Sequence, residues 1–297
     1  MKTRFSTLGA SSFFLSVLIA TSALAAAPLA APRTAAATML ASHKAVYSVS
    51  LTSTRPGGDY LDVSGKMSLE FADKCDVWKT TQKSLLRTVT GEGGEESSRS
   101  DFTAWESKAG DLYTFSISQT QNGDVSAITG SATRSGPDGA GVAEYSKPQH
   151  KTYKLPAHFT FPTAQQIKLV EVARKGVRFF SGDLFDGSEG GGASHYSAVI
   201  LKPESDAMLK PAPKGPQLDS SLLDGPAYRV RVAFYPPAGT DDTKDGDEPG
   251  ESANQPEYEM TMTVHDNGVI SDYDYDYQDF SVHGKLDAIK ALPRPHC

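Results

Sequence analysis

The sequence predicts a mainly β fold: a large antiparallel meander that curls into an open or spiral barrel around one buried helix. Apolar and polar residues alternate along most of the chain after residue 39, as half-buried strands require. Only residues 161–176 form a long segment with helical periodicity. Because strand twist makes a large sheet curl, split or close, the simplest arrangement is a sheet wrapped about that helix. A two-sheet sandwich fits the same alternation and is the alternative.

Residues 1–25 have the features of a secretory signal peptide. Two basic residues precede an apolar run at residues 13–20, and a small-x-small cleavage site follows at residues 23–25. The apolar run is short for a membrane span, and an uncleaved anchor is the alternative. Residues 26–38 are mostly Ala and Pro and are expected to form a linker. Residues 39–297 would then make a single exported domain.

The two cysteines, Cys75 and Cys297, bear on the number of domains. In an exported protein they most simply form one disulfide, and two free thiols are the alternative. No CxxC motif or Cys/His spacing indicates a metal or redox site. A bond over so long a loop would stabilise the fold by roughly 5 kcal/mol in the chain-entropy model. Such a bond favours one closed domain over two separate ones.

Alternating runs predict the strands in order along the chain. The clearest of these runs are residues 47–51, 61–71, 113–117, 125–128, 228–234 and 258–264. Gly57-Gly58-Asp59 separates the first two runs, and Asn122-Gly123 and Asn267-Gly268 lie where two-residue hairpin turns need positive backbone angles. One strand per alternating run gives about a dozen strands connected as a meander.

The helix is expected to span residues 163–175. Thr163 can act as the N-cap, with Gln166 completing a capping box, and Gly176 stands where a C-terminal glycine stop belongs. The polar residues form one narrow stripe, which consists of Lys168, Glu171 and Lys175. Apolar residues cover most of the remaining circumference, namely Ile167, Leu169, Val170, Val172 and Ala173. A helix with this distribution is buried on several sides.

The segment SDYDYDYQDF at residues 271–280 places three tyrosines on one sheet face and three aspartates on the other. The tyrosines are Tyr273, Tyr275 and Tyr277, and the acids are Asp272, Asp274 and Asp276. One hypothesis is that the tyrosines, together with Met262, line an interior groove for sugar rings or an acyl chain. The favoured alternative is an ordinary half-buried strand with its aromatic residues on the helix and its acids in solvent.

Catalytic and metal-binding patterns are weak. The sequence has no GxSxG elbow and no HExxH motif, and its seven histidines are scattered, so we expect neither an enzyme nor a cofactor or metal site. Residues 241–247 resemble part of a calcium loop, but Ser252 stands where the closing Glu is needed, which favours a solvated acidic loop over residues 241–250. The net charge of −7 disfavours nucleic acid and anionic membrane surfaces as partners.

Several short phrases, taken together, resemble one family. They are Ser42-His43-Lys44-Ala45-x-Tyr47, Cys75-Asp76-x-Trp78, Phe102-Thr103-Ala104-Trp105-Glu106-Ser107-Lys108-x-Gly110, Tyr153-x-Leu155-Pro156, Phe161-Pro162-Thr163, Tyr258-Glu259, Asn267-Gly268-Val269, Asp279-Phe280, and Leu292-Pro293 before Cys297. The chain from about His43 to Cys297 resembles the cell-envelope integrity protein EipB family of alphaproteobacteria. The resemblance implies a spiral of antiparallel strands around a helix, location in the periplasm, and a disulfide between Cys75 and Cys297.

The resemblance also implies a role in envelope maintenance under stress, without catalytic residues. We therefore expect a non-enzymatic periplasmic protein that binds another envelope protein or assembly factor. The alternative is a carrier or sensor that holds a lipid or lipoprotein acyl chain inside the curled sheet. A carrier needs an unfilled interior lined by residues such as Tyr273, Tyr275 and Met262, whereas a partner-binding protein needs an exposed edge or patch.

Overall fold

The computed structural model describes residues 39–91, 93–136, 138–188, 191–201, 214–237 and 255–297. The expected signal peptide and linker, the acidic loop at residues 241–250, and most of the glycine- and proline-rich segments lie outside these ranges. Within the described ranges, no helix is long and apolar enough to cross a membrane.

The described residues form fourteen strands, one α-helix and one short 3-10 helix. The first eight strands are β1 (His43–Thr54), β2 (Tyr60–Lys74), β3 (Val77–Thr90), β4 (Glu95–Ser107), β5 (Leu112–Gln121), β6 (Asp124–Arg134), β7 (Gly141–Lys147) and β8 (Lys151–Leu155). The helix α1 (Pro162–Arg174) follows. The remaining elements are β9 (Phe179–Leu184), β10 (Ser194–Ile200), η1 (Ser220–Leu222), β11 (Ala227–Pro237), β12 (Tyr258–His265), β13 (Ile270–Tyr277) and β14 (Phe280–Ala291).

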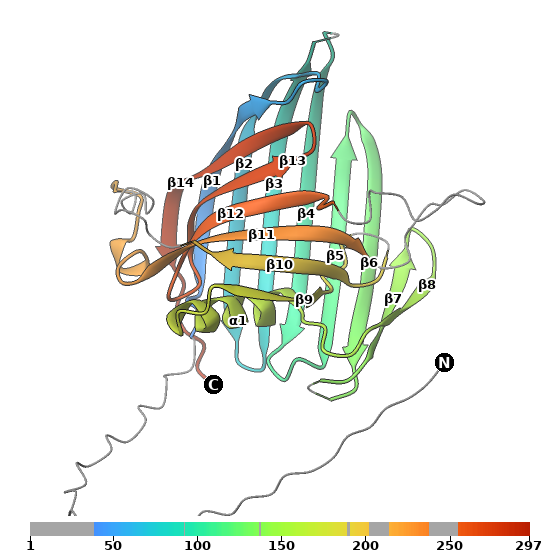
Figure 1. The fold of residues 1–297 in the computed structure, drawn as a ribbon, viewed down its shortest axis with the longest axis vertical. Helices are drawn as coiled ribbons and strands as arrows, with labels where there is room; N and C mark the ends of the chain where they lie inside the picture. Colours follow the sequence, from blue (N-terminus) through green and yellow to red (C-terminus); the bar gives the residue numbers. More distant parts are fainter. Residues whose placement is uncertain (1–38, 92, 137, 189–190, 202–213, 238–254) are drawn as a thin grey trace, which may run out of the picture. The chain divides into compact units, whose positions relative to one another are not determined.

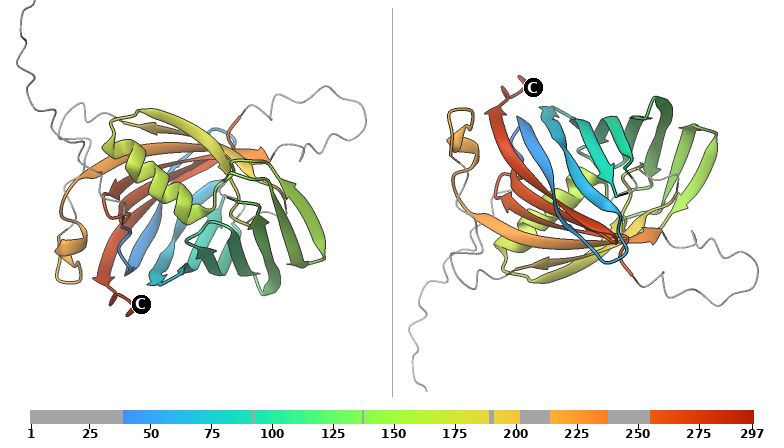
Figure 2. Two further views of the ribbon diagram at one scale, coloured as in Figure 1. Left: turned by 90° about the horizontal axis from the view of Figure 1, so that it is seen from below. Right: turned by 90° about the horizontal axis from the view of Figure 1, so that it is seen from above.

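All fourteen strands belong to one antiparallel sheet that is not closed. Its order is β8-β7-β6-β5-β4-β3-β2-β1-β14-β13-β12-β11-β10-β9 (Figure 1). The first and last strands therefore pair in the middle of the sheet, from His43 opposite Ala291 to Thr54 opposite Phe280. Seen from below, the sheet curls so that β9 to β12 pass on one side of α1 and the N-terminal strands on the other (Figure 2). The predicted spiral around a helix is confirmed, and the sandwich alternative is wrong.

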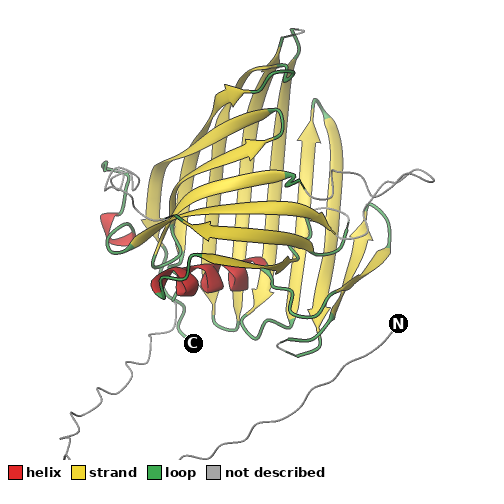
Figure 3. Ribbon diagram, viewed as in Figure 1, coloured by secondary structure: helices red, strands yellow, loops and turns green. Residues whose placement is uncertain are grey.

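The helix joins the two free edges of the sheet, because it connects β8 to β9 (Figure 3). Just before it, Thr160 donates its N–H to the carbonyl of Asp183 at 2.8 Å and accepts from the N–H of Phe185 at 3.0 Å. These two hydrogen bonds attach the segment leading into α1 to the edge strand β9. The helix is thereby held at the lower end of the curl (Figure 1).

The predicted capping box is wrong. The N-cap is Phe161, without a side-chain cap, and the N–H groups of Thr163 and Ala164 donate to the carboxylate of Glu106 at 2.7 and 2.8 Å. Glu106 is on β4 and only 3 % exposed. The carboxylate of a distant strand therefore satisfies two of the free N–H groups that begin the helix.

The other end of the helix follows the prediction. Gly176 has a φ of +68°, and it donates to the carbonyl of Ala173 at 3.0 Å while Val177 donates to that of Val172 at 3.2 Å. This is the Schellman arrangement that glycine favours. Burial is strongest on one face, which consists of Thr163, Leu169, Val170 and Ala173. Lys168 and Lys175 are exposed and Glu171 is half-buried, so the polar stripe faces away from the core.

The disulfide joins Cys75, in the turn between β2 and β3, to Cys297, beyond β14. The Cα atoms are 5.7 Å apart, and the predicted pairing is confirmed. The bond ties the C-terminal segment to the N-terminal half of the sheet. The chain there is also held by a hydrogen bond from the Leu292 N–H to the Ser42 carbonyl at 2.9 Å.

Two large groups of buried side chains fill most of the interior. The first packs α1 against β1 and the strands from β9 to β14, with Val170, Tyr196 and Val264 among its least exposed residues. The second, here called the aromatic cluster, lies under β4 to β8 and consists chiefly of Tyr113, Phe115, Tyr145, Phe159, Phe161 and Phe185. The segment leading into the helix supplies Phe159 and Phe161, so it connects the two groups.

Candidate functional site

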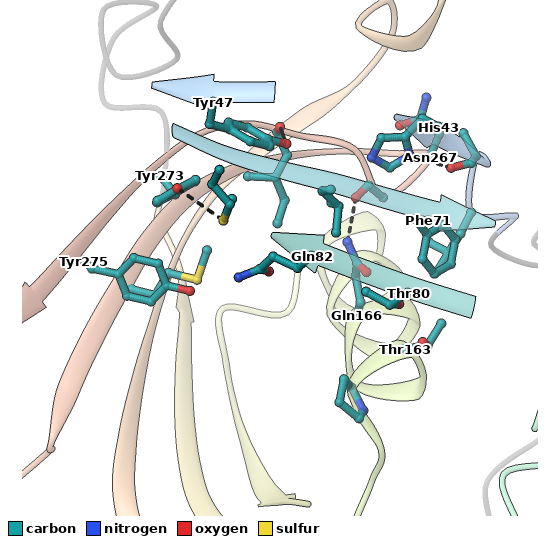
Figure 4. A pocket seen from close by; sticks show the side chains of 18 residues that line it. His43, Tyr47, Phe71, Thr80, Gln82, Thr163, Gln166, Asn267, Tyr273 and Tyr275 are labelled. Carbon is teal, nitrogen blue, oxygen red and sulfur yellow. Dashed lines mark hydrogen bonds between the residues drawn. The ribbon is translucent and has the colours of Figure 1, made fainter. Parts of the chain in front are cut away.

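A cavity of about 220 Å³ lies inside the curl, between the strands β1 to β3, the strands β12 and β13, and the start of α1 (Figure 4). Its lining is mostly apolar and aromatic. The lining residues are Leu40, Ala41, His43, Tyr47, Met67, Leu69, Phe71, Thr80, Gln82, Pro162, Thr163, Gln166, Met260, Asn267, Gly268, Ile270, Tyr273 and Tyr275. Apolar lining with a few polar groups is typical of small-ligand sites.

Strand register brings the lining residues of β1, β2 and β3 to one wall. Tyr47 pairs with Met67, and further along His43 pairs with Phe71. Phe71 in turn pairs with Thr80 on β3, two residues from Gln82, which faces the same side of the sheet. The opposite wall comes from β12 and β13, where Met260 pairs with Tyr275. The cavity therefore exists only because the curl brings the two halves of the sheet face to face.

Two of the four residues predicted to line a groove do so. Tyr273 and Tyr275 lie on the cavity wall. Tyr277 belongs instead to a neighbouring cluster, where its ring centroid is 5.0 Å from that of Phe280. Met262 packs in the core beside the helix and is not a lining residue. The alternation assigned the correct face to all four residues, but it could not predict how far along the strands the void extends.

The tyrosines of the cavity differ in their hydrogen bonds. The Tyr47 hydroxyl donates to the carbonyl of Ile270 at 2.8 Å, and the Tyr273 hydroxyl contacts only the sulfur of Met67 at 3.7 Å. In the described part of the chain, neither the Tyr275 hydroxyl nor the Gln82 amide has a hydrogen-bond partner. Both side chains point into the cavity from opposite walls (Figure 4). Two neutral polar groups are thus available to a ligand there.

His43 lies at the other end of the cavity and is 4 % exposed. Its Nδ1 is 2.7 Å from the carbonyl oxygen of Ala41, and a carbonyl only accepts, so Nδ1 carries the proton and Nε2 is left as an acceptor. Nε2 has no partner among the described residues. Burial lowers the pKa of the His43 imidazole, more than the hydrogen bond to Ala41 raises it. The ring is therefore neutral at pH 7.

No lining residue of the described cavity is an aspartate, glutamate, lysine or arginine. Burial raises the pKa values of the Tyr47, Tyr273 and Tyr275 phenols, which stay protonated at neutral pH. Across the described ranges, no group of three or more His, Cys, Asp and Glu residues could hold a metal ion. The cavity presents neutral hydrogen-bonding groups in an apolar setting.

The acids on the other face of β13 are not in solvent, which corrects the expectation for them. Arg229 on β11 contacts Asp272 at 2.5 Å and Asp274 at 2.6 Å, and His283 on β14 contacts Asp274 at 2.7 Å. Burial raises the pKa of Asp274, but the hydrogen bonds from His283 and Arg229 outweigh it and hold the pKa below its ordinary value. This face is a paired polar network, and sequence alternation gave no sign of its partners.

Comparison with known proteins connects this architecture to one family. A family model described as EipB-like matches residues 34–293. The cell envelope integrity protein EipB of Brucella abortus (strain 2308) is 25% identical over 255 residues, which cover 85% of this chain and 84% of that protein. A crystal structure of a β-barrel-like protein of a domain of unknown function, DUF1849, also from Brucella abortus, superimposes with a TM-score of 0.71. It covers 86% of this chain and all of that one at 23% identity, which bears on the fold alone.

Proposed function

Because this chain belongs to the EipB-like family, we propose that it is a non-enzymatic periplasmic protein that supports cell-envelope integrity and stress resistance by binding another envelope component. Its mode of action is to hold an apolar group of that component, such as a lipid or lipoprotein acyl chain, inside the curled sheet. The name of the Brucella relative supports the envelope role. The Cys75–Cys297 bond supports an oxidising compartment, because disulfides persist in the bacterial periplasm.

One observation carries the binding proposal: the interior contains a cavity whose walls come from both halves of the sheet. Tightly packed interiors contain few voids larger than a water molecule. A concave apolar pocket of about 220 Å³ lined by Met67, Met260 and three tyrosines is therefore suited to an apolar ligand. An acyl chain matches its shape and polarity better than a charged or strongly hydrated ligand.

Native mass spectrometry of protein purified from its own periplasm tests this function. A co-purifying mass in the range of a lipid or acylated peptide is expected. Thr80→Phe should abolish it by filling the cavity, whereas Thr81→Phe, the same change on the opposite face of β3, should leave it in place. A clean apo mass for the wild-type protein, together with no binding of added lipid, would refute the proposal.

A second candidate function is docking of an envelope protein at the sheet edge. Phe179 on the edge strand β9 is 65 % exposed, and Val177 beside it is 45 % exposed. Thr160 occupies this edge only near Asp183 and Leu184, and a strand edge with exposed apolar side chains can accept an added strand. Phe179→Asp should then abolish capture of the partner protein while the cavity ligand is retained. If that variant still captures the partner protein, docking at the sheet edge is refuted and only the cavity proposal remains.

A further inference from the structure

We propose that the occupant of the cavity carries its acyl chain on an uncharged carbonyl group, an amide or an ester, and not as a free carboxylate. This inference rests on the proposed binding function and specifies the chemistry of its ligand. Two observations support it. Some polar side chains in the cavity have no protein partner among the described residues, and the described lining contains no charged residue.

The unpartnered polar groups match a carbonyl. Gln82 and Tyr275 point into the cavity from opposite walls, and each offers a neutral hydrogen-bond donor (Figure 4). A carbonyl oxygen has two lone pairs and can accept from both. Nε2 of His43, near Phe71, has no partner among the described residues, but it is itself buried, so the recognition of the carbonyl rests on Gln82 and Tyr275.

The charges explain why a carboxylate is excluded. Moving an ionised carboxylate from water into an apolar site is costly unless a cation or several hydrogen bonds compensate. The described lining contains no Lys or Arg, and burial keeps the His43 ring neutral. An amide or ester keeps the same alkyl chain and carbonyl without the charge.

The volume sets the length of chain. Pockets for drug-sized ligands are about 300–1,000 Å³, and this cavity, at about 220 Å³, is smaller. It accommodates one short alkyl segment with its carbonyl, not a whole lipid. We therefore choose six-carbon probes, and a longer natural chain would extend beyond the described cavity.

The test is calorimetric titration of the full mature protein with three probes of equal chain length: N-methylhexanamide, methyl hexanoate and sodium hexanoate. At pH 7.5 the amide and the ester are expected to bind at least about tenfold more tightly than hexanoate, a difference of about 1.4 kcal/mol. Equal or tighter binding of hexanoate would overturn the inference while leaving the binding function in place. Binding of none of the three would refute the binding function itself.

Variants identify the recognising groups. Gln82→Leu and Tyr275→Phe should each reduce the preference for the amide over hexanoate by about threefold to tenfold, as expected for loss of one neutral hydrogen bond. Matched controls are Gln119→Leu, an exposed residue of β5 that does not line the cavity, and Tyr277→Phe, outside the cavity, and both should keep the wild-type preference. If both cavity variants keep it as well, the inference is wrong.

The same acyl carbonyl can come from an acylated peptide or from a phospholipid. A hexanoylated peptide amide and dihexanoylphosphatidylcholine below its micelle concentration separate these sources. Tighter binding of the peptide identifies an amide-linked chain, and tighter binding of the phospholipid identifies an ester-linked one; either outcome supports an uncharged carbonyl. Displacement of both by hexanoate at equal concentration would contradict it.

Discussion

The aromatic cluster under β4 to β8 and the cavity wall of β13 both contain tyrosines, but their hydroxyl groups differ in their hydrogen bonds. In the cluster, the hydroxyls of Tyr113 and Tyr145 reach the carbonyls of Asp186 and Gly191 at 3.0 and 3.2 Å. At the cavity wall, Tyr275 has no such partner within the described chain. Rings that touch on all sides and have satisfied hydroxyls stabilise the fold, whereas rings that border a void are available for binding.

Packing around the two glycines nearest these rings sharpens the difference. A Cβ at Gly187 would lie 2.6 Å from the Phe115 ring, so the cluster has no spare room. A Cβ at Gly284 would lie 2.0 Å from the Tyr273 ring, which also lines the cavity. We therefore expect the aromatic cluster to tolerate added volume less well than the cavity wall does. Each of the following experiments measures the two regions side by side.

The largest effect is expected from reduction of the disulfide. The bond closes a loop with a sequence separation of 222 residues, which corresponds to roughly 5 kcal/mol in the chain-entropy model. Reductant should lower the melting temperature by several degrees or more. Hydrogen exchange should rise first in β14 and β1, beside the cavity, and last in the aromatic cluster. An unchanged melting curve, or equal loosening of both regions, would contradict this.

Phe115→Ala should have the next largest effect, because it leaves a hole in the fully packed aromatic cluster. The expected loss is about 3–5 kcal/mol in the free energy of unfolding, measured by urea denaturation. Tyr275→Phe, at the cavity, should cost less than about 1 kcal/mol because its hydroxyl leaves no protein partner unsatisfied. Similar losses for the two variants would remove the distinction between the regions.

Gly284→Ala should act mainly on the cavity. The new methyl group displaces the Tyr273 ring towards the void, at a cost of about 1–3 kcal/mol for overpacking. Binding of the hexanoyl amide should be lost, while ring packing in the aromatic cluster, followed by near-ultraviolet circular dichroism, stays unchanged. Gly215→Ala is the control, because the nearest atom to its Cβ would be 3.6 Å away. Full binding by Gly284→Ala would place the ligand elsewhere.

The smallest effect concerns pH, and its sign differs between His43 at the cavity and Glu106 at the start of the helix. Burial lowers the pKa of His43 below its ordinary 6.5, so the stability contributed by the neutral ring is present above pH 6.5 and is lost as the pH falls. Burial raises the pKa of Glu106, against the hydrogen bonds from Thr163 and Ala164, above its ordinary 4.5. That contribution is present below pH 4.5 and is lost as the pH rises through the folded value.

Unfolding free energies measured between about pH 7.5 and pH 5 check the histidine part of this expectation. His43→Gln should lose less stability on acidification than the wild-type protein, whereas the exposed His150→Gln should follow the wild-type curve. Glu106→Gln should reduce the loss of unfolding free energy that the wild-type protein shows as the pH rises above 4.5. Parallel curves for His43→Gln and the wild-type protein would show that the imidazole is not held neutral by burial.

Local patterns were sufficient for most of the fold. Period-two alternation predicted β1, β2, β5, β6, β11, β12 and β13, and Gly176 predicted the end of the helix, because both depend on neighbours in sequence. The start of the helix was predicted to within one residue, but its capping group was missed, since Glu106 is 57 residues away from Thr163. A side chain from a distant strand leaves no mark in the local sequence. The same reason hid Arg229 and His283 as partners of the β13 acids.

The candidate site was only half predictable. Tyr273 and Tyr275 were identified because three tyrosines in strict alternation are unusual. Gln82, His43 and Met67 were not identified, because their strands show no unusual sequence pattern. They become part of a site only when β1 to β3 face β13. Where a void ends along a strand depends on side chains from both halves of the curl. That information is absent from any single segment.

Because β1 pairs with β14, each strand lies beside its neighbours along the chain, as if the chain were circular. Among the described strands, the one exception is β8 and β9, which form the two edges of the sheet. The hydroxyl of Ser48 donates to the carboxylate of Asp287, although the two residues are 239 positions apart. If residues 39 and 297 were linked and the chain were cut between β8 and α1, where no two strands pair across the cut, the strand order would be kept and this contact would become local. Such a circular permutant should reach the same fold faster, because folding rates rise as contacts become closer in sequence.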